Sequence, residues 1–364
     1  MNSRDRVLIA LDHEEPDQVP ITDHMYMRKS LENVLGENGV TTDDSRRYLK
    51  ACKTLGFDLI TVFTSPPPFK PRSLDVEEEV DGWGRRWRVD KESDMLWYLG
   101  GPVKTREDYD RVRNRLVFPG DPGDMFVSAK KLVELTKGEY ALAGMVDGPF
   151  TPSWEMMGFT EFCKSLYHDT SLVESLCGDF SRWNIEIGRR LIELGVDMIW
   201  IADDLGASTE PLVSPSMFRK HILPFLREEV NEFLIRDVKV ILHSCGRVMQ
   251  FMNDIIDTGI VGIHPLERSA GMNLKEMKDK YGDRLTLIGN VEGKSLIPYG
   301  SREEIKRDVL NCLKIGAPGG GYIFATDHSL HMGMPAEKIR YTFDLAKKYG
   351  EYPKKLVRHF DAAT

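Results

Sequence analysis

Length, composition and charge set broad limits on this chain of 364 residues. Its 49 Lys and Arg against 57 Asp and Glu give a formal net charge of −8, which argues against a nucleic-acid-binding surface. No apolar run reaches the roughly 18 residues of a membrane span, and the charged N-terminus lacks the apolar core of a signal peptide. We therefore expect a cytoplasmic protein that acts on small molecules or proteins.

Short runs of β-branched and aliphatic residues alternate with amphipathic segments along the chain. Such apolar runs are typical of strands buried on both faces of a parallel sheet. In chain order the runs are 18–22, 57–63, 140–146, 196–202, 238–243, 259–264, 285–290 and 321–326. Their alternation with helical segments predicts an α/β fold of the (β/α)8 TIM-barrel type. The charged amphipathic segment before the first run predicts an N-terminal helical extension.

The segments between the runs carry helix start and stop signals. Amphipathic patterns cover 212–236, 274–281 and 302–314. Ser214 and Pro215 are typical of a helix N-cap and first turn, and Gly316 of a helix end.

The stretch between the second and third runs is too long for one helix. Residues 81–88 predict a hairpin, and a helix is expected from about Thr105, so we predict a hairpin-plus-helix insertion between strands 2 and 3. No repeat or flexible linker interrupts the chain. We expect residues 1–364 to form a single barrel domain.

Active sites of TIM barrels lie where the strands end at their carboxyl side. Acids, histidines and one thiol are concentrated just there. The residues at these ends include Asp23, His24, Asp147, Asp203, Asp204, His243, Cys245, His264, Glu267, Asn290, Glu292, Asp327 and His328. The sequence therefore predicts a polar site at this end of the barrel.

His243 and Cys245 form the sharpest local pattern. Side chains alternate along a strand, so both point to the same side, and an imidazole beside a thiolate suits Zn²⁺. A third ligand is expected from the neighbouring strand ends: His328, Asp327, Asp203, Asp204, Glu267 or Glu292. Two other interpretations are open: a hydrogen-bonded histidine beside a small buried cysteine, or a Cys/His nucleophile pair.

Paired carboxylates follow the fourth run. Asp203 and Asp204 are candidates to bind a metal, accept a proton or orient His243, and one of them is expected to cap the following turn. Glu292, after the seventh run, is a candidate catalytic carboxylate with the same alternative. His331, in the loop after the last run, is interpreted as solvated.

The loop 148–158 is apolar and aromatic. Trp154, Met156 and Met157 could form one wall for a flat or hydrophobic ligand at the barrel mouth, or they could simply pack the loop.

Several segments resemble the uroporphyrinogen decarboxylase superfamily over nearly the whole length. They are 4–11, 16–20, 214–215 with Phe218, 223–224, 289–291 and 334–339. The resemblance implies the same TIM barrel that the strand count predicts. It also implies one of two chemistries.

Decarboxylases of the superfamily hold a tetrapyrrole with an N-terminal arginine pair and an aspartate after the second strand. Here the corresponding stretch, 25–29, contains a single arginine, Arg28, and 64–68 contains no aspartate. The mouth is also acidic, whereas an octacarboxylate ligand needs several cations. Decarboxylation of uroporphyrinogen, or tetrapyrrole binding without catalysis, is the alternative function.

The other branch, to which this chain is more similar, holds zinc-dependent methyltransferases that act with corrinoid proteins in anaerobes. They carry His-x-Cys on the fifth strand and a third ligand, usually cysteine, after the eighth. His243 and Cys245 match the pair, and His328 falls near the third position, with Asp327 beside it. The resemblance implies zinc, a corrinoid carried by a small partner protein, and a small methyl donor or acceptor such as a thiol, tetrahydrofolate or a methyl ether. Trp154, Met156 and Met157 would then help line the corrin.

Overall fold

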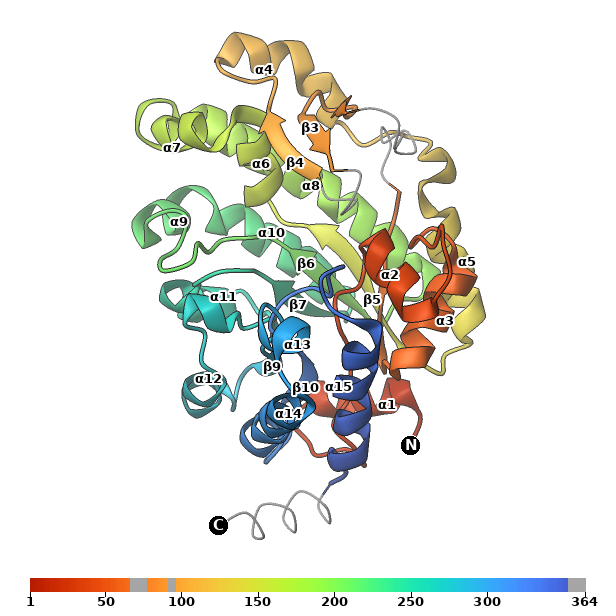
Figure 1. The fold of residues 1–364 in the computed structure, drawn as a ribbon. Helices are drawn as coiled ribbons and strands as arrows, with labels where there is room; N and C mark the ends of the chain where they lie inside the picture. Colours follow the sequence, from red (N-terminus) through yellow and green to blue (C-terminus); the bar gives the residue numbers. More distant parts are fainter. Residues whose placement is uncertain (66–76, 91–95, 353–364) are drawn as a thin grey trace.

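The protein is described from a computed structural model that covers residues 1–65, 77–90 and 96–352. Its centre is a curled sheet of seven parallel strands in the order β1-β5-β6-β7-β8-β9-β10 (Figure 1). The strands are β1 (Leu59–Val62), β5 (Ala141–Asp147), β6 (Met198–Ala202), β7 (Lys239–His243), β8 (Gly262–His264), β9 (Thr286–Val291) and β10 (Tyr322–Thr326). Each overlaps one predicted run, so seven of the predicted strands are confirmed.

The predicted first strand, 18–22, is wrong as a regular strand. Ile21 forms only an isolated parallel bridge with Phe324 of β10. On its other side the Ile21 carbonyl accepts the N–H of Asp58, 2.7 Å away, just before β1. Pro20 has no N–H to continue a ladder, which explains why the pairing is broken. The segment nevertheless bonds to both edge strands and lies in the gap between them.

Helices surround the sheet on its outer side (Figure 1). The α-helices are α1 (Ser3–Leu11), α2 (Arg28–Leu35), α3 (Ser45–Leu55), α4 (Arg106–Val112), α5 (Val127–Thr136), α6 (Phe150–Met157), α7 (Phe159–His168), α8 (Thr170–Leu194), α9 (Pro215–His221), α10 (Leu223–Leu234), α11 (Met252–Ile256), α12 (Leu274–Tyr281), α13 (Leu296–Tyr299), α14 (Arg302–Gly316) and α15 (Ala336–Tyr349). Short 3-10 helices are η1 (Arg113–Leu116), η2 (Gly123–Phe126), η3 (Met249–Phe251) and η4 (Arg268–Ala270). No helix in these described residues combines the length and hydropathy needed to cross a membrane.

Two helix signals are confirmed, and one helical segment is divided. Ser214 accepts the Met217 N–H as the N-cap of α9, with Pro215 in the first turn. The amphipathic segment 212–236, expected to be helical, forms two helices, α9 and α10. Pro224 at the start of α10 lacks the N–H that a continuous helix would use, so the chain restarts there.

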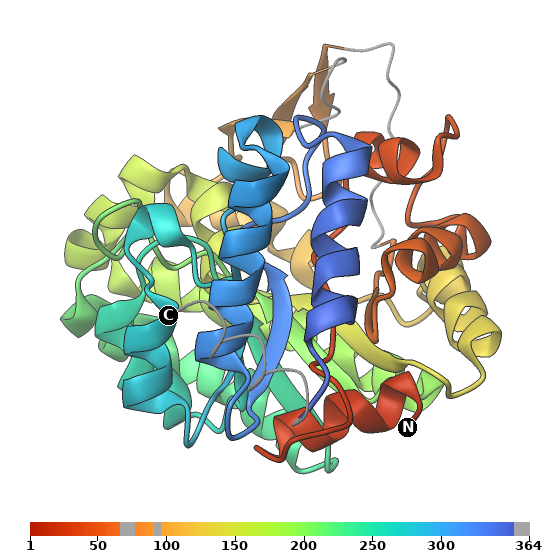
Figure 2. The ribbon, with the colours of Figure 1, turned by 60° about the horizontal axis from the view of Figure 1, so that its bottom comes forward.

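The interior of the sheet is apolar and closed at one end. Val7, Ala10 and Leu11 of α1 pack with inward side chains of the strands, such as Trp200 and Ile241, in one buried cluster. Figure 2 shows α1 lying across this end of the molecule. The N-terminal helix thus blocks the amino ends of the strands and leaves the carboxyl ends for a site.

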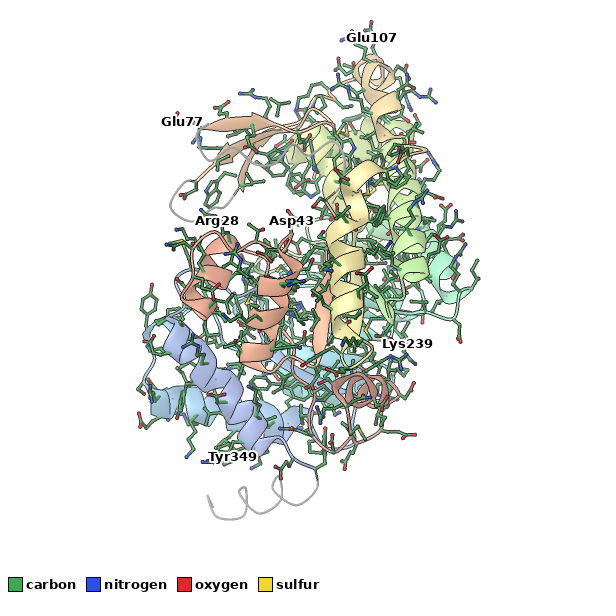
Figure 3. The ribbon with its side chains drawn as sticks, turned by 90° about the vertical axis from the view of Figure 1, so that its right-hand side faces the viewer. Arg28, Asp43, Glu77, Glu107, Lys239 and Tyr349 are labelled. Carbon is green, nitrogen blue, oxygen red and sulfur yellow. The ribbon has the colours of Figure 1, made fainter. Side chains whose placement is uncertain are left out.

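The insertion between β1 and β5 lies at the opposite end. Instead of a lone hairpin it contains a three-stranded antiparallel sheet, β2 (Glu78–Val80), β3 (Arg86–Val89) and β4 (Leu96–Gly100). Helix α4 follows, with Thr105 in a capping box as its N-cap. Figure 3 shows Glu77 and Glu107 of the insertion at one end of the molecule and Tyr349 of α15 at the other. The single-domain organisation stays a prediction.

Candidate metal centre

His243 and Cys245 converge at the carboxyl end of β7. His243 is the last residue of the strand, and Cys245 lies two residues further on. The Sγ atom of Cys245 is 3.5 Å from Nε2 of His243. The imidazole is largely buried, whereas the cysteine is half-buried. The two groups therefore face each other as the alternation of strand side chains predicts.

Asp204 is the third member of this group. Ala202 of β6 pairs with His243 of β7, so the chain two residues past Ala202 lies beside Cys245. The Asp204 Oδ1 atom accepts the Cys245 backbone N–H at 2.9 Å and lies 3.6 Å from Nε2 of His243. Among the described residues, Asp204, His243 and Cys245 offer three potential ligand atoms within 4.8 Å of one another.

This donor set fits zinc. Zinc–ligand bonds of about 2.0–2.3 Å in a tetrahedron place neighbouring ligand atoms about 3.3–3.8 Å apart. The separations of 3.5 Å and 3.6 Å from His243 Nε2 to Cys245 Sγ and to Asp204 Oδ1 fall in that range. Burial and the nearby carboxylates of Asp204 and Glu267 raise the pKa of the Cys245 thiol, so a cation is needed to ionise it at neutral pH. Imidazole, thiolate and carboxylate are all accepted zinc ligands.

Asp203 has a different task from its neighbour. Its buried carboxylate accepts the backbone N–H groups of Phe150, at 3.1 Å, and Thr151, at 2.7 Å, in the first turn of α6. Burial raises the pKa of Asp203 to about 7. Asp203 thus caps a turn, but the turn is the first of α6, which precedes Asp203 in the chain, and not the turn after β6 that the sequence predicts. Its carboxylate holds α6 and is not part of the ligand group.

The loop after β10 does not supply the third ligand in this structure. Asp327 accepts the N–H groups of Gly293 and Arg268, so its carboxylate ties three loops together. His328 lies outside the group of three ligand atoms, and its Nδ1 is 3.3 Å from the Ser329 carbonyl. Asp204 takes the place that was expected for His328.

Glu292 is also occupied by its own loop. Its carboxylate accepts the N–H groups of Ser295, at 2.7 Å, and Leu296, at 2.7 Å. The amide of Asn290 donates to the carbonyls of Leu266 and Met272. Both carboxylate oxygens of Glu292 thus accept hydrogen bonds at the start of α13, which favours the capping alternative, and its catalytic role stays a prediction.

The predicted ligand wall at α6 is mostly core. The side chains of Met156 and Met157 are 0 % exposed, so they pack the helix and present nothing to a docked ligand. Trp154 is partly buried and packs edge-on against Tyr98 of β4, with ring centroids 5.2 Å apart. The packing interpretation holds for both methionines, and Trp154 links α6 to the insertion.

Two further histidines surround His243. Nδ1 of His264, at the end of β8, lies 2.7 Å from Nδ1 of His243. The ring of His24 packs 5.1 Å from that of His243. Burial lowers the pKa of both His24 and His264. Both were recognisable as residues that follow apolar runs, but the contact of His264 with His243 depends on the register of β7 and β8, in which the two residues are paired.

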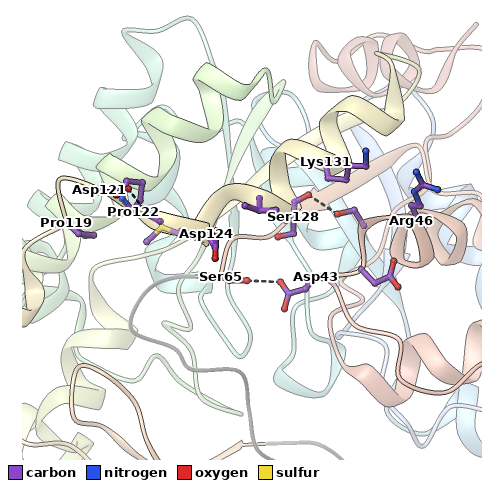
Figure 4. Close-up of a pocket in the computed structure, with 14 residues that line it drawn as sticks. Asp43, Arg46, Ser65, Pro119, Asp121, Pro122, Asp124, Ser128 and Lys131 are labelled. Atoms are coloured by element: carbon purple, nitrogen blue, oxygen red, sulfur yellow. Dashed lines mark hydrogen bonds between the residues drawn. The ribbon is translucent and has the colours of Figure 1, made fainter.

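A cavity of about 890 Å³ lies away from this centre, between the start of α3 and the η2–α5 region (Figure 4). Its lining includes Asp43, Arg46, Asp124 and Lys131 but none of the predicted site residues. We identify the candidate site by its cluster of potential metal-ligand atoms, and not by the volume of this cavity.

Fold and site together define an α/β protein built on a curled parallel sheet, with a candidate metal centre at the carboxyl ends of its strands. A family model described as uroporphyrinogen decarboxylase (URO-D) matches residues 92–349. The chain belongs to this family, which confirms the resemblance predicted from the sequence.

Relatives in the family carry two different names. A methylcobamide:CoM methyltransferase, MtbA, of Methanosarcina acetivorans is 25% identical over 300 residues, covering 81% of each chain. A uroporphyrinogen decarboxylase of Aliivibrio salmonicida is 24% identical over 377 residues, covering 95% of this chain and 98% of that one. Among solved structures, a methyltransferase from Methanosarcina mazei superposes with a TM-score of 0.72 at 21% identity, over 96% of this chain and 99% of that one. The structural likeness establishes the shared fold.

Proposed function

We propose that the protein is a zinc-dependent methyltransferase that moves a methyl group between a corrinoid on a small partner protein and a small substrate. The substrate is a thiol, tetrahydrofolate or a methyl ether. The convergence of Asp204, His243 and Cys245 at the strand ends carries this proposal. Relatives named methylcobamide:CoM methyltransferases support it.

The three side chains would hold zinc and leave a coordination position open. Catalytic zinc sites typically have three protein ligands and one exchangeable position, whereas structural sites have four. The Asp204 side chain is 51% exposed, so the group is accessible from the solvent side. When bound there, zinc favours the ionised form of a substrate thiol or polarises an ether oxygen.

Residues of this chain hold that arrangement in place. Asp203 fixes the start of α6, and Asp327 joins the loops after β8, β9 and β10. The loop of Cys245 is fixed by Glu267, whose carboxylate accepts the Gly246 N–H at 2.8 Å. The corrinoid of the partner protein would supply or take up the methyl group at its cobalt, and the residues of this chain would hold the substrate heteroatom that exchanges the methyl group with it. The reverse transfer uses the same groups.

The test combines metal content with methyl transfer. Purified wild type should contain about one zinc per chain, and His243→Ala and Cys245→Ala should contain little. Wild type should demethylate free methylcobalamin with a thiol such as 2-mercaptoethanesulfonate or with tetrahydrofolate, followed by the corrinoid absorbance. Equal, negligible zinc in all three proteins contradicts the proposal.

The decarboxylase alternative predicts a different result in a parallel assay. Turnover of uroporphyrinogen by metal-free protein, unchanged in His243→Ala and Cys245→Ala, would assign the chain to that chemistry. Corrinoid-protein binding without methyl transfer to any acceptor would indicate a non-catalytic barrel.

A further inference from the structure

The contact between His243 and His264 is unusual because both partners are imidazoles. Their Nδ1 atoms are 2.7 Å apart, and the ring centroids are 4.9 Å apart. Both residues are buried: His264 is 0% exposed and His243 is 6% exposed. At this separation one nitrogen must donate a proton and the other must accept it.

The strands force this contact. His243 ends β7 and His264 ends β8, and the two residues are register partners in the parallel sheet. Trp200 of β6 packs edge-on against the His264 ring, with centroids 5.0 Å apart. Trp200 therefore holds the His264 ring in place, with its Nδ1 directed at His243, the candidate metal ligand.

Two neutral arrangements satisfy the hydrogen bond. If His264 donates, the proton of His243 is on Nε2, the atom that faces Cys245 and Asp204. If His243 donates from Nδ1, its Nε2 carries a free electron pair toward those two residues. Only the second arrangement lets Nε2 bind a cation, because a metal binds the unprotonated nitrogen.

We propose that His264 is a positioning residue that accepts the Nδ1–H of His243 and so presents the unprotonated Nε2 to the metal. The Nε2 atom of His264 has no hydrogen-bond partner among the described residues. Among the described residues, the contact with His243 is therefore the side-chain hydrogen bond that orients the buried His264 imidazole. The inference rests on the proposed zinc site and adds the group that fixes its histidine ligand.

Two nearly isosteric variants separate acceptance of the hydrogen bond from packing. His264→Asn keeps an acceptor near the position of Nδ1, whereas His264→Leu removes it. We expect His264→Leu to weaken zinc binding, measured by competition with a chromophoric chelator, by about 10–100-fold, and His264→Asn to stay within about threefold of wild type. His24→Leu is the matched control, since the His24 ring packs on His243 while its Nδ1 lies 3.1 Å from the Ser329 hydroxyl. It should also stay within about threefold.

A second measurement does not depend on metal affinity or on the folding of a variant. In ¹⁵N-histidine-labelled wild type, two-bond ¹H–¹⁵N correlations should show the His243 proton on Nδ1 and none on Nε2, both without metal and with zinc. A proton on Nε2 in the metal-free protein overturns the proposal. So does an equal loss of zinc affinity in the Leu and Asn variants, or no loss in either. If wild type binds no zinc, the proposed function fails, and the tautomer measurement still decides the role of His264.

Discussion

Two levels of the same strands have opposite chemistry. At the lower level, Ile241 of β7 and Ile288 of β9 lie in the apolar cluster that α1 closes. Two residues further on, β7 carries His243, which is nearly as buried as the isoleucine below it. Side chains that point inward recur every second residue along a strand. Moving two residues toward the carboxyl end therefore changes the inner side of the curled sheet from apolar to polar.

The two levels contribute differently to the protein. The lower level stabilises the fold through apolar burial, about 25 cal/mol for each Å² removed from water. The upper level gains little in this way, since each buried polar atom must first recover the hydrogen bond it loses to water. Substitutions below should therefore change stability. The effect of a substitution above should depend on whether the side chain holds a neighbouring loop or helix, or offers an atom to the metal.

The largest effect on stability is expected at the lower level. Trp200→Ala removes a fully buried indole and should lower the free energy of unfolding by about 3–5 kcal/mol. Urea unfolding followed by circular dichroism measures this loss. Tyr299→Ala, at a position 85% exposed, is the control and should stay within about 0.5 kcal/mol of wild type. Equal effects in the two variants would contradict the assignment of Trp200 to the core.

Adjacent acids at the upper level provide a sharper comparison. Asp203→Ala leaves two backbone N–H groups of α6 without their acceptor, so the free energy of unfolding should fall by about 2–4 kcal/mol with zinc content retained. Asp204→Ala should cost about 1 kcal/mol or less, because the side chain is half exposed, yet weaken zinc binding by more than about 100-fold. Both quantities are measured on the same preparations, by urea unfolding and chelator competition. The reverse pattern would exchange the roles of the two acids.

Asp23 gives the upper level a pH dependence. Its buried carboxyl contacts Thr326 and the His24 N–H, and burial raises its pKa to about 7 from an ordinary value of 3.8. The folded state therefore binds this proton more tightly than the unfolded state. The resulting stability is fully present below pH 3.8 and is lost as the pH rises through about 7.

Burial raises the pKa of the Asp23 carboxyl but lowers the pKa of the buried histidines His24 and His264, so their effects on stability change with pH in opposite directions. Comparing wild type with Asp23→Asn isolates the effect of the carboxyl. Between pH 5 and pH 7 the stability of wild type minus that of the variant should fall by about 1 kcal/mol per pH unit. Urea unfolding at a series of pH values measures it. A difference that is constant or rises with pH would show that Asp23 is ionised in the folded protein.

Much of this architecture follows from local sequence patterns. Seven strands were predicted from apolar runs, the cap at Ser214 from residue type, and the start of a helix at about Thr105. The failures have definite causes. Pro20 interrupts the first strand, and Pro224 divides a helix, although the amphipathic pattern continues through both. The hydrophobic pattern of a segment indicates which of its faces is buried. Whether its backbone hydrogen bonds continue depends instead on the N–H group that a proline lacks.

The sequence predicted where the candidate site lies and two of its residues, His243 and Cys245, but not all of its candidate ligands. His243 and Cys245 are two residues apart at the end of one strand, so their meeting follows from the local alternation of side chains. Which of the two adjacent acids turns inward depends on the N–H groups of α6, 52 and 53 residues away in sequence. The partner of His243 depends on the offset between β7 and β8, which neither strand specifies alone. Contacts within a strand can be read from a sequence, whereas contacts between strands require the register.

The smallest effect is expected at His328, which the family pattern made a ligand. We expect His328→Ala to keep zinc affinity within about threefold of wild type, because Asp204 completes the group and the imidazole lies outside it. Chelator competition measures this beside Cys245→Ala, which should lose most of the affinity. If His328→Ala loses as much zinc as Cys245→Ala, the loop after β10 must bring its imidazole to the metal and displace Asp204. The carboxylate would then be free to accept the substrate proton, the other role that the sequence allows for it.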